Sequence, residues 1–217
     1  MRYRCLILDH DDTVMDSTRM IHYPAFLAAL EEMRPTHYVS LDDYFLLNFE
    51  PGFLPYCEQT LGCTERETER EYEIWQSFVK ARVPVCFEGM RKIIERQKAE
   101  GGLVCVVSHS VRDNILRDYA ENGLPEPDCV FGWEQPKEMR KPSVYPVEEI
   151  RRRFGLQPEE CLVIDDLKPG YDMARDAGVA FAGAGWAHRI APIQVFMRGL
   201  PNYFETPEAL AAYLEME

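Results

Sequence analysis

The fold is decided by the stretch YRCLILDHDDT, which occupies residues 3–13. It begins as a short apolar run and becomes acidic at Asp9, as a buried strand of a parallel sheet does where it ends. Further apolar runs lie at residues 103–107, 129–131, 161–164 and 179–182, and helical patterns lie between them at residues 89–99, 112–121, 147–154 and 172–177. This alternation predicts an α/β fold with a parallel sheet and helices on both of its faces.

Residues 16–85 have a different pattern, and we call them the helical module. Apolar residues recur at helical spacing within this stretch, and Thr64 and Glu67 have the spacing of a capping box. The chain is therefore predicted to contain a core formed by residues 1–15 and 86–217, into which the helical module is inserted.

The composition limits the classes of partner. The 217 residues include 37 acidic and 24 basic ones, with a formal net charge of −13. Such a chain is not expected to bind nucleic acid by neutralising phosphates, or to dock on an anionic membrane. No apolar run approaches the roughly 20 residues of a membrane span, and the N-terminus does not resemble a signal peptide. We expect a cytoplasmic protein.

The number and spacing of the cysteines also favour the cytoplasm. There are seven, which is an odd number, and no Cys-x-x-Cys occurs. This pattern indicates reduced thiols, and it offers no pair for a zinc site.

Polar side chains follow the predicted strands. Asp9 and Asp11 come after the first strand, Ser108 after the second, and Asp165–Asp166 after a third. Lys141 lies in a loop that leads into a predicted helix. Because the carboxyl ends of parallel strands meet at one edge of a sheet, we expect these side chains to lie close together.

These residue types suit the transfer of a phosphoryl group. Clustered carboxylates favour a hard cation such as Mg²⁺. One aspartate of the first motif would attack phosphorus, and the other would protonate the leaving oxygen and later deprotonate water. Ser108 and Lys141 would hold the phosphoryl oxygens. The alternatives are that Ser108 only caps the next helix and that Lys141 is a solvated surface lysine.

Four stretches resemble, in order, the motifs of the haloacid dehalogenase-like (HAD) hydrolase superfamily. The first motif, a strand followed by Asp-x-Asp-x-Thr, is matched by residues 6–17. The second, a Ser or Thr after a strand, is matched by residues 106–108, and the third, a Lys often followed by Pro, by residues 140–142. The fourth is an acidic pair before a helix that ends in Ala-Gly, and residues 163–178 match it.

The resemblance implies a Rossmann-like core in which Asp9 is the nucleophile and Asp11 the general acid and base. It also implies that Mg²⁺ is held by Asp9, the backbone carbonyl of Asp11 and Asp166, with Asp165 supporting it from beside. The helical module would be the cap that members of the phosphatase and β-phosphoglucomutase-like subgroup insert after the first strand. Such a cap closes over the site and carries much of the substrate choice.

A few positions depart from the commonest family pattern. Asp12 stands where Gly is usual, His109 where Asn is frequent, and Gly170 where many members have an aspartate. We consider His109 and His10 as substrate contacts, although alternation favours packing of His10 against the edge of the core or bonding to backbone.

The resulting hypothesis is a Mg²⁺-dependent phosphatase that hydrolyses a small phosphorylated metabolite through an aspartyl-phosphate. The alternatives are a phosphosugar mutase of the same family and a non-catalytic regulator that binds phosphate or a protein. A dehalogenase is disfavoured, because those relatives lack the second aspartate that this chain has at Asp11.

Overall fold

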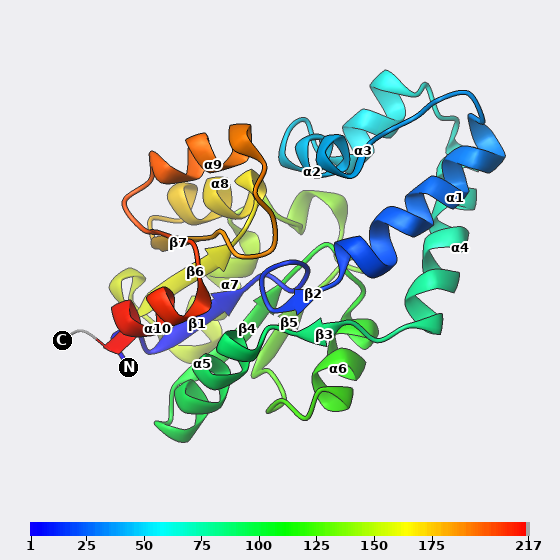
Figure 1. The fold of residues 1–217 in the computed structure, drawn as a ribbon. Helices are drawn as coiled ribbons and strands as arrows, with labels where there is room; N and C mark the ends of the chain where they lie inside the picture. Colours follow the sequence, from blue (N-terminus) through cyan, green and yellow to red (C-terminus); the bar gives the residue numbers. More distant parts are fainter. Residues whose placement is uncertain (216–217) are drawn as a thin grey trace.

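The computed structural model describes residues 1–215 and has an α/β fold (Figure 1). Six parallel strands form one sheet in the order β5-β4-β1-β6-β7-β8. Their bounds are β1 Cys5–Leu8, β4 Leu103–Val107, β5 Cys129–Phe131, β6 Cys161–Asp165, β7 Ala180–Ala184 and β8 Tyr203–Phe204. The predicted parallel α/β architecture is confirmed, and the first strand lies inside the sheet between β4 and β6.

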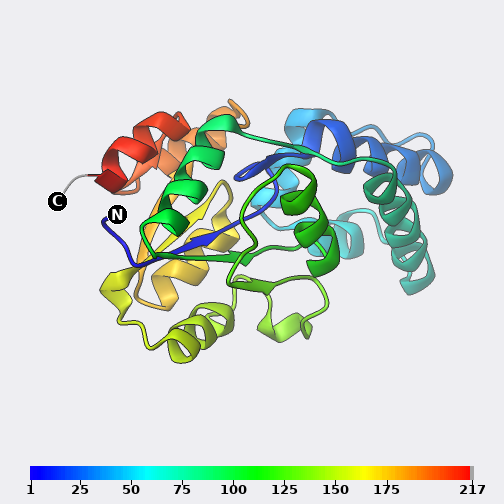
Figure 2. The same ribbon diagram turned by 90° about the horizontal axis from the view of Figure 1, so that it is seen from below.

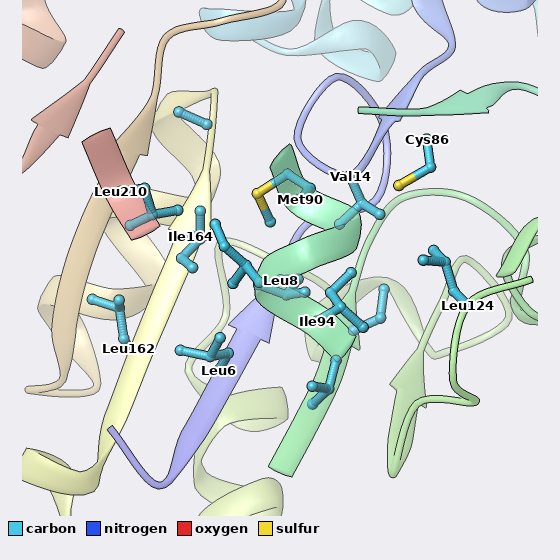
Figure 3. Close-up of a cluster of buried hydrophobic side chains, with 14 of the residues drawn as sticks. Leu6, Leu8, Val14, Cys86, Met90, Ile94, Leu124, Leu162, Ile164 and Leu210 are labelled. Atoms are coloured by element: carbon cyan, nitrogen blue, oxygen red, sulfur yellow. The ribbon is translucent and has the colours of Figure 1, made fainter. Parts of the chain in front are cut away.

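One face of the sheet is covered by three helices. These are α5 (Glu88–Ala99), α6 (Arg112–Glu121) and α10 (Pro207–Glu215). They pack on Leu6 and Leu8 of β1 and on the equivalent residues of neighbouring strands. Figure 3 shows this cluster of hydrophobic side chains, with α5 lying over the strands.

The opposite face is covered by α7 (Tyr145–Phe154), α8 (Lys168–Asp176) and α9 (Ala191–Arg198). Here Cys5 and Ile7 of β1 are fully buried in a second hydrophobic cluster. Successive residues of a strand point to opposite faces, so a run of apolar residues is required when both faces are covered.

The register of the strands brings their carboxyl ends to one level. Leu8 pairs with Val106 of β4 and with Ile164 of β6. The next residue, Asp9, donates its backbone N–H to the carbonyl oxygen of Ile164 at 2.9 Å. The polar residues that follow these three strands therefore lie side by side.

The helical module is connected to the core by a short antiparallel pair of strands, β2 (Met15–Asp16) and β3 (Val85–Cys86). The helices between these strands lie to one side of the sheet, as Figures 1 and 2 show. They are two π-helical turns, η1 Thr18–His22 and η2 Tyr56–Thr60, and the α-helices α1 Tyr23–Met33, α2 Leu41–Phe49, α3 Phe53–Pro55 and α4 Glu65–Ala81. They enclose a hydrophobic cluster of their own, centred on Phe26, Leu30 and Tyr44.

The predicted capping box begins α4. Thr64 Oγ1 accepts a hydrogen bond from the backbone N–H of Glu67 at 3.3 Å. The Glu67 carboxylate accepts one from the backbone N–H of Thr64 at 2.9 Å. The backbone N–H groups of Thr64 and Glu67 are thus each bonded to the side chain of the other residue, which fixes where the helix starts.

Several elements carried too weak a pattern to be predicted. α2 has buried residues on adjacent positions rather than at helical spacing, because it packs against both its own module and the core. Phe49 of α2 contacts Phe196 of α9, with ring centroids 5.2 Å apart. Also unpredicted are α9, the two-residue strands, and the 3-10 turns η3 Lys137–Met139 and η4 Pro158–Glu160. Within residues 1–215, no helix is both long enough and apolar enough to cross a membrane.

Candidate active site

A cavity of about 390 Å³ lies between the carboxyl edge of the sheet and the helical module. Its floor on the core side contains Asp9, Ser108 and Lys141. The helical module contributes a wall that is rich in aromatic side chains, among them Tyr44 and Trp75. This is the place where ligands bind in open parallel sheets.

Lys141 joins two carboxylates at the base of the cavity. Its Nζ donates to Asp9 Oδ1 at 2.6 Å and to Asp165 Oδ2 at 2.8 Å. The lysine side chain is only 6% exposed, so the alternative of a solvated surface lysine is wrong. Burial lowers the pKa of Lys141, but the charges of Asp165 and Asp9 outweigh it and raise the pKa overall. Lys141 is therefore a fixed cation at this site.

The carboxyl group of Asp9 responds mainly to its burial. Removal from water raises the pKa of Asp9 to about 7, although the Lys141 ammonium opposes this shift. A buried carboxyl group with a raised pKa at the base of a cavity is typical of a functional group.

Three carboxylates are placed to hold a cation. Asp9, Asp165 and Asp166 each offer one oxygen, and these oxygens lie within 4.8 Å of one another. Oδ1 of Asp166 accepts a hydrogen bond from Thr13 Oγ1 at 3.3 Å. Oδ2 of Asp166 is buried and accepts no hydrogen bond from residues 1–215, although the ring nitrogen Nε2 of His188 lies 3.4 Å from it. An all-oxygen donor set with one buried, unsatisfied oxygen fits Mg²⁺. The side chain of Asp11 is not a member of this group.

Asp11 is instead surrounded by hydrogen-bond donors. Its Oδ1 accepts from Ser17 Oγ at 2.7 Å and from His22 Nε2 at 2.8 Å. Its Oδ2 accepts from Ser110 Oγ at 2.6 Å and from Ser108 Oγ at 3.4 Å. Burial raises the pKa of Asp11, but the contact with His22 and the hydrogen bond from Ser110 outweigh it and lower the pKa overall. The four donors stabilise the ionised carboxylate.

The helical module reaches Asp11 through His22. Trp75 of α4 donates its indole N–H to His22 Nδ1 at 2.8 Å. Since Nδ1 accepts this bond, we assign the ring proton to Nε2, which then donates to Asp11. The two rings also stack, with centroids 6.0 Å apart.

Of the donors to Asp11, sequence reasoning named Ser108 as a site residue but missed Ser17, His22 and Ser110. Ser110 follows Ser108 by two residues, just as Asp11 follows Asp9, and that spacing was a usable signal. His22 and Trp75 are 53 residues apart, and nothing in the pattern of either helix indicates their contact.

Ser108 and His109 both line the cavity. Ser108 is buried, and its Oγ accepts from the backbone N–H of Ser110 at 3.1 Å. It does not cap α6, which begins at Arg112 with Val111 as its N-cap residue. His109 Nε2 donates to the backbone carbonyl of Lys141 at 2.9 Å and leaves the rest of its ring open to the cavity.

His10 does not reach the cavity, so we withdraw it as a candidate substrate contact. Its ring is 1% exposed and stacks on Tyr119 with centroids 6.1 Å apart. His10 Nε2 lies 3.1 Å from Asp118 Oδ2. As alternation in the extended chain predicts, the side chain of His10 points into the core. Its partner there is the carboxylate of Asp118 rather than a backbone group.

Two of the unusual positions have structural explanations. Asp12 has a φ of +59°, and its Oδ1 accepts from the backbone N–H of Thr18 at 3.3 Å. This conformation favours Gly, but Asp tolerates it when its side chain bonds locally. At Gly170, an added Cβ would lie 2.2 Å from Cγ of Asp165. Gly170 therefore leaves room for the carboxylate that Lys141 contacts.

Comparison with known proteins agrees with this geometry. The family described as haloacid dehalogenase-like hydrolase matches residues 6–184. No curated protein sequence matches the chain significantly.

The solved structures that resemble the chain share its fold over nearly its full length. CbbY from Rhodobacter sphaeroides, in complex with xylulose-1,5-bisphosphate, is 16% identical with a TM-score of 0.76, over 99% of this chain and 100% of that one. A haloacid dehalogenase-like family hydrolase from Streptococcus pneumoniae is 16% identical with a TM-score of 0.77, over 99% of both chains. A HAD family hydrolase from Deinococcus radiodurans, with bound phosphate and sodium, is 17% identical with a TM-score of 0.70, over 98% of this chain and 95% of that one. At such identities the likeness shows the fold alone.

Proposed function

Because the chain belongs to the haloacid dehalogenase-like hydrolase family, we propose that it is a Mg²⁺-dependent phosphatase acting on a small phosphorylated metabolite. The observation that carries the proposal is the pairing of two different carboxyl groups at one cavity. Asp9 is held by Lys141 beside the cation-binding carboxylates, and Asp11 is held apart from them by its own donors. Asp9 and Asp11 therefore differ in their hydrogen-bond partners, and because the pKa of Asp11 is lowered in the free protein, Asp11 must take up a proton before it can act as the acid.

In the first step, a carboxylate oxygen of Asp9 attacks the phosphorus atom. A P–O bond forms to Asp9, the bond from phosphorus to the ester oxygen breaks, and Asp11, which has first taken up a proton from the bound phosphate monoanion, gives that proton to the ester oxygen. The donors around Asp11, including Ser110 and His22, stabilise the carboxylate that remains.

In the second step, Asp11 accepts a proton from water as that water attacks phosphorus. The bond between phosphorus and Asp9 breaks, and inorganic phosphate leaves. Ser108 and Lys141 supply donors for the phosphoryl oxygens during both steps. Lys141 also keeps Asp9 in place through its 2.6 Å contact.

The metal would be held by the carboxylates of Asp9, Asp165 and Asp166 and by the backbone carbonyl of Asp11. When bound, Mg²⁺ would offset the negative charge of the phosphate and of these carboxylates. Asp166 Oδ2, which is buried and without a hydrogen-bond partner among residues 1–215, would then be satisfied.

The helical module, residues 16–85, would act as the cap over this site. Its aromatic side chains line the cavity, and His22 joins it directly to Asp11. The xylulose-1,5-bisphosphate in the CbbY structure and the phosphate ion in the Deinococcus structure support a phosphorylated substrate. Seven free thiols support the reducing cytoplasm as the compartment.

The test is phosphate release from a panel of phosphorylated metabolites. We expect release that requires Mg²⁺, stops with a chelator, and falls about 10⁴-fold or more in Asp9→Asn. The matched control is Asp176→Asn, which alters an exposed aspartate outside the cavity and should keep full activity.

Full activity of a folded Asp9→Asn variant would refute the proposal. Isomer formation without net phosphate release would favour a phosphosugar mutase, in which the cap keeps water from the intermediate. Binding of phosphate without any turnover would favour the non-catalytic regulator.

A further inference from the structure

Arg140 lies in the wall of the cavity with its guanidinium group held in place. Its Cζ lies 4.0 Å from the ring centroid of Trp133, as in a cation–π contact. Its Nε donates to the backbone carbonyl of Gln135 at 2.6 Å. Stacking and this hydrogen bond fix the plane of the group and leave its terminal nitrogens without a protein acceptor among residues 1–215.

This cation has no acidic partner in the part of the chain that the structure describes. Glu134 and Glu138 act on Arg140 through their charge, but neither forms an ion pair with it. The Glu134 carboxylate is engaged elsewhere, accepting from the backbone N–H of Arg112 at 3.1 Å. In contrast, Arg70 of the helical module forms two ion pairs on the surface.

An unpaired cation that is half-buried is unfavourable unless an anion completes its environment. Burial lowers the pKa of Arg140, which agrees with incomplete compensation of its charge. Other stacked arginines of this chain lie outside the cavity. Arg153 on Phe154 is an example, with its Cζ 5.4 Å from the ring centroid.

Arg140 lies close in the chain to the residues proposed to hold the phosphoryl group. It directly precedes Lys141, which contacts Asp9. Trp133, beneath its guanidinium group, meets the ring of His109 edge-on with centroids 6.0 Å apart. His109 in turn follows Ser108. Arg140, Lys141 and Ser108 line the same cavity, so one small molecule bound there can contact both Arg140 and the residues proposed to hold the phosphoryl group.

We propose that Arg140 binds a second anionic group of the substrate, a carboxylate or a second phosphate, and so selects doubly anionic phosphomonoesters. A guanidinium group offers two parallel N–H donors that match either oxyacid. The inference rests on the proposed phosphatase function and adds a substrate class to it.

The test compares kcat/KM for matched substrates with one and two anionic groups. The carboxylate pair is 3-phosphoglycerate against glycerol 1-phosphate. The phosphate pair is fructose 1,6-bisphosphate against fructose 6-phosphate. We expect the wild-type enzyme to prefer the doubly anionic member of at least one pair by roughly ten- to hundredfold, the effect of a charge-assisted hydrogen bond. The pair that shows the preference identifies the second anion.

Variants test whether Arg140 causes that preference. R140Q should reduce it to about unity, and R140K should retain part of it because the charge remains. R153Q, which alters the stacked arginine outside the cavity, should leave it unchanged. If R140Q lowers kcat/KM equally for both members of each pair, or if the wild-type enzyme shows no preference, the inference is overturned.

Hydrolysis of p-nitrophenyl phosphate distinguishes failure of the inferred substrate class from failure of the proposed phosphatase function. If the wild-type enzyme hydrolyses this compound but shows no preference for a second anion, only the substrate class is wrong. If it hydrolyses neither this compound nor any of the four metabolites, the phosphatase function fails and the inference fails with it.

Discussion

The two walls of the cavity differ in how they are built. The core wall consists of charged and hydroxyl side chains, such as Asp9 and Ser108, that follow strands in exact register and bond to one another. The wall of the helical module is richer in aromatic and apolar side chains, and its carboxylate group is that of Glu71. Under the proposed function, this difference assigns the reaction chemistry to residues that follow the strands and recognition of the organic part of the substrate to the inserted helices.

The sharpest test of this division is Asp11→Asn, which removes the acid and base from the core wall. We expect kcat/KM for an alkyl phosphate to fall about 10²- to 10⁴-fold. The loss should be smaller for p-nitrophenyl phosphate, because its leaving group needs no proton. Steady-state kinetics with both compounds measures this, and equal losses would contradict the role of Asp11 as an acid.

Metal binding to the core wall should depend on pH. Below the pKa of about 7 for Asp9 in the metal-free protein, its carboxyl group is mostly protonated, and Mg²⁺ must displace that proton. The affinity should therefore weaken about tenfold as the pH falls from 8 to 6. Calorimetric titration at each pH tests this, with Asp176→Asn as a control that should show the same dependence. An affinity that does not change over this range would contradict the raised pKa.

The contact between the two walls is tested by Trp75→Phe. This change keeps an aromatic ring but removes the N–H that donates to His22. Loss of one hydrogen bond is worth about 1 kcal/mol, so the free energy of unfolding should fall by about that amount and kcat by at most about fivefold. A loss as large as that of Asp11→Asn would show that the helical module takes part in the chemistry, and the division between the walls would fail.

The smallest effect should come from Thr64→Ala, which removes the capping box of α4 far from the cavity. The free energy of unfolding should fall by about 1 kcal/mol, and the melting temperature by about 2–4 °C. Phosphate release at room temperature should be unchanged. A marked loss of activity would mean that the start of α4 positions the aromatic wall.

Sequence reasoning succeeded for the core wall because its residues follow strands. Apolar runs placed Asp9, Ser108 and Asp166 at one edge, and the structure brings all three to the cavity. It also anticipated the inward direction of His10, although the buried partner Asp118 comes from a helix that no local pattern connects to it.

The aromatic wall was not predictable in the same way. Its contacts join residues far apart in the chain, such as His22 with Trp75, and Phe45 with His188 of the core at 4.6 Å between ring centroids. Short segments such as α2 bury residues toward two partners at once, so their hydrophobic pattern has no single period.

The central claim is that Asp9 becomes covalently phosphorylated, and the most direct test is to trap that state. Asp11→Asn should still be phosphorylated by p-nitrophenyl phosphate with Mg²⁺, but it should hydrolyse the phosphoenzyme slowly because water is no longer activated. Mass spectrometry of the acid-quenched protein should then find one phosphoryl group on the peptide that contains Asp9, and none in the variant that also carries Asp9→Asn. Turnover without any phosphorylated peptide, or a phosphoryl group on another residue, would contradict the account.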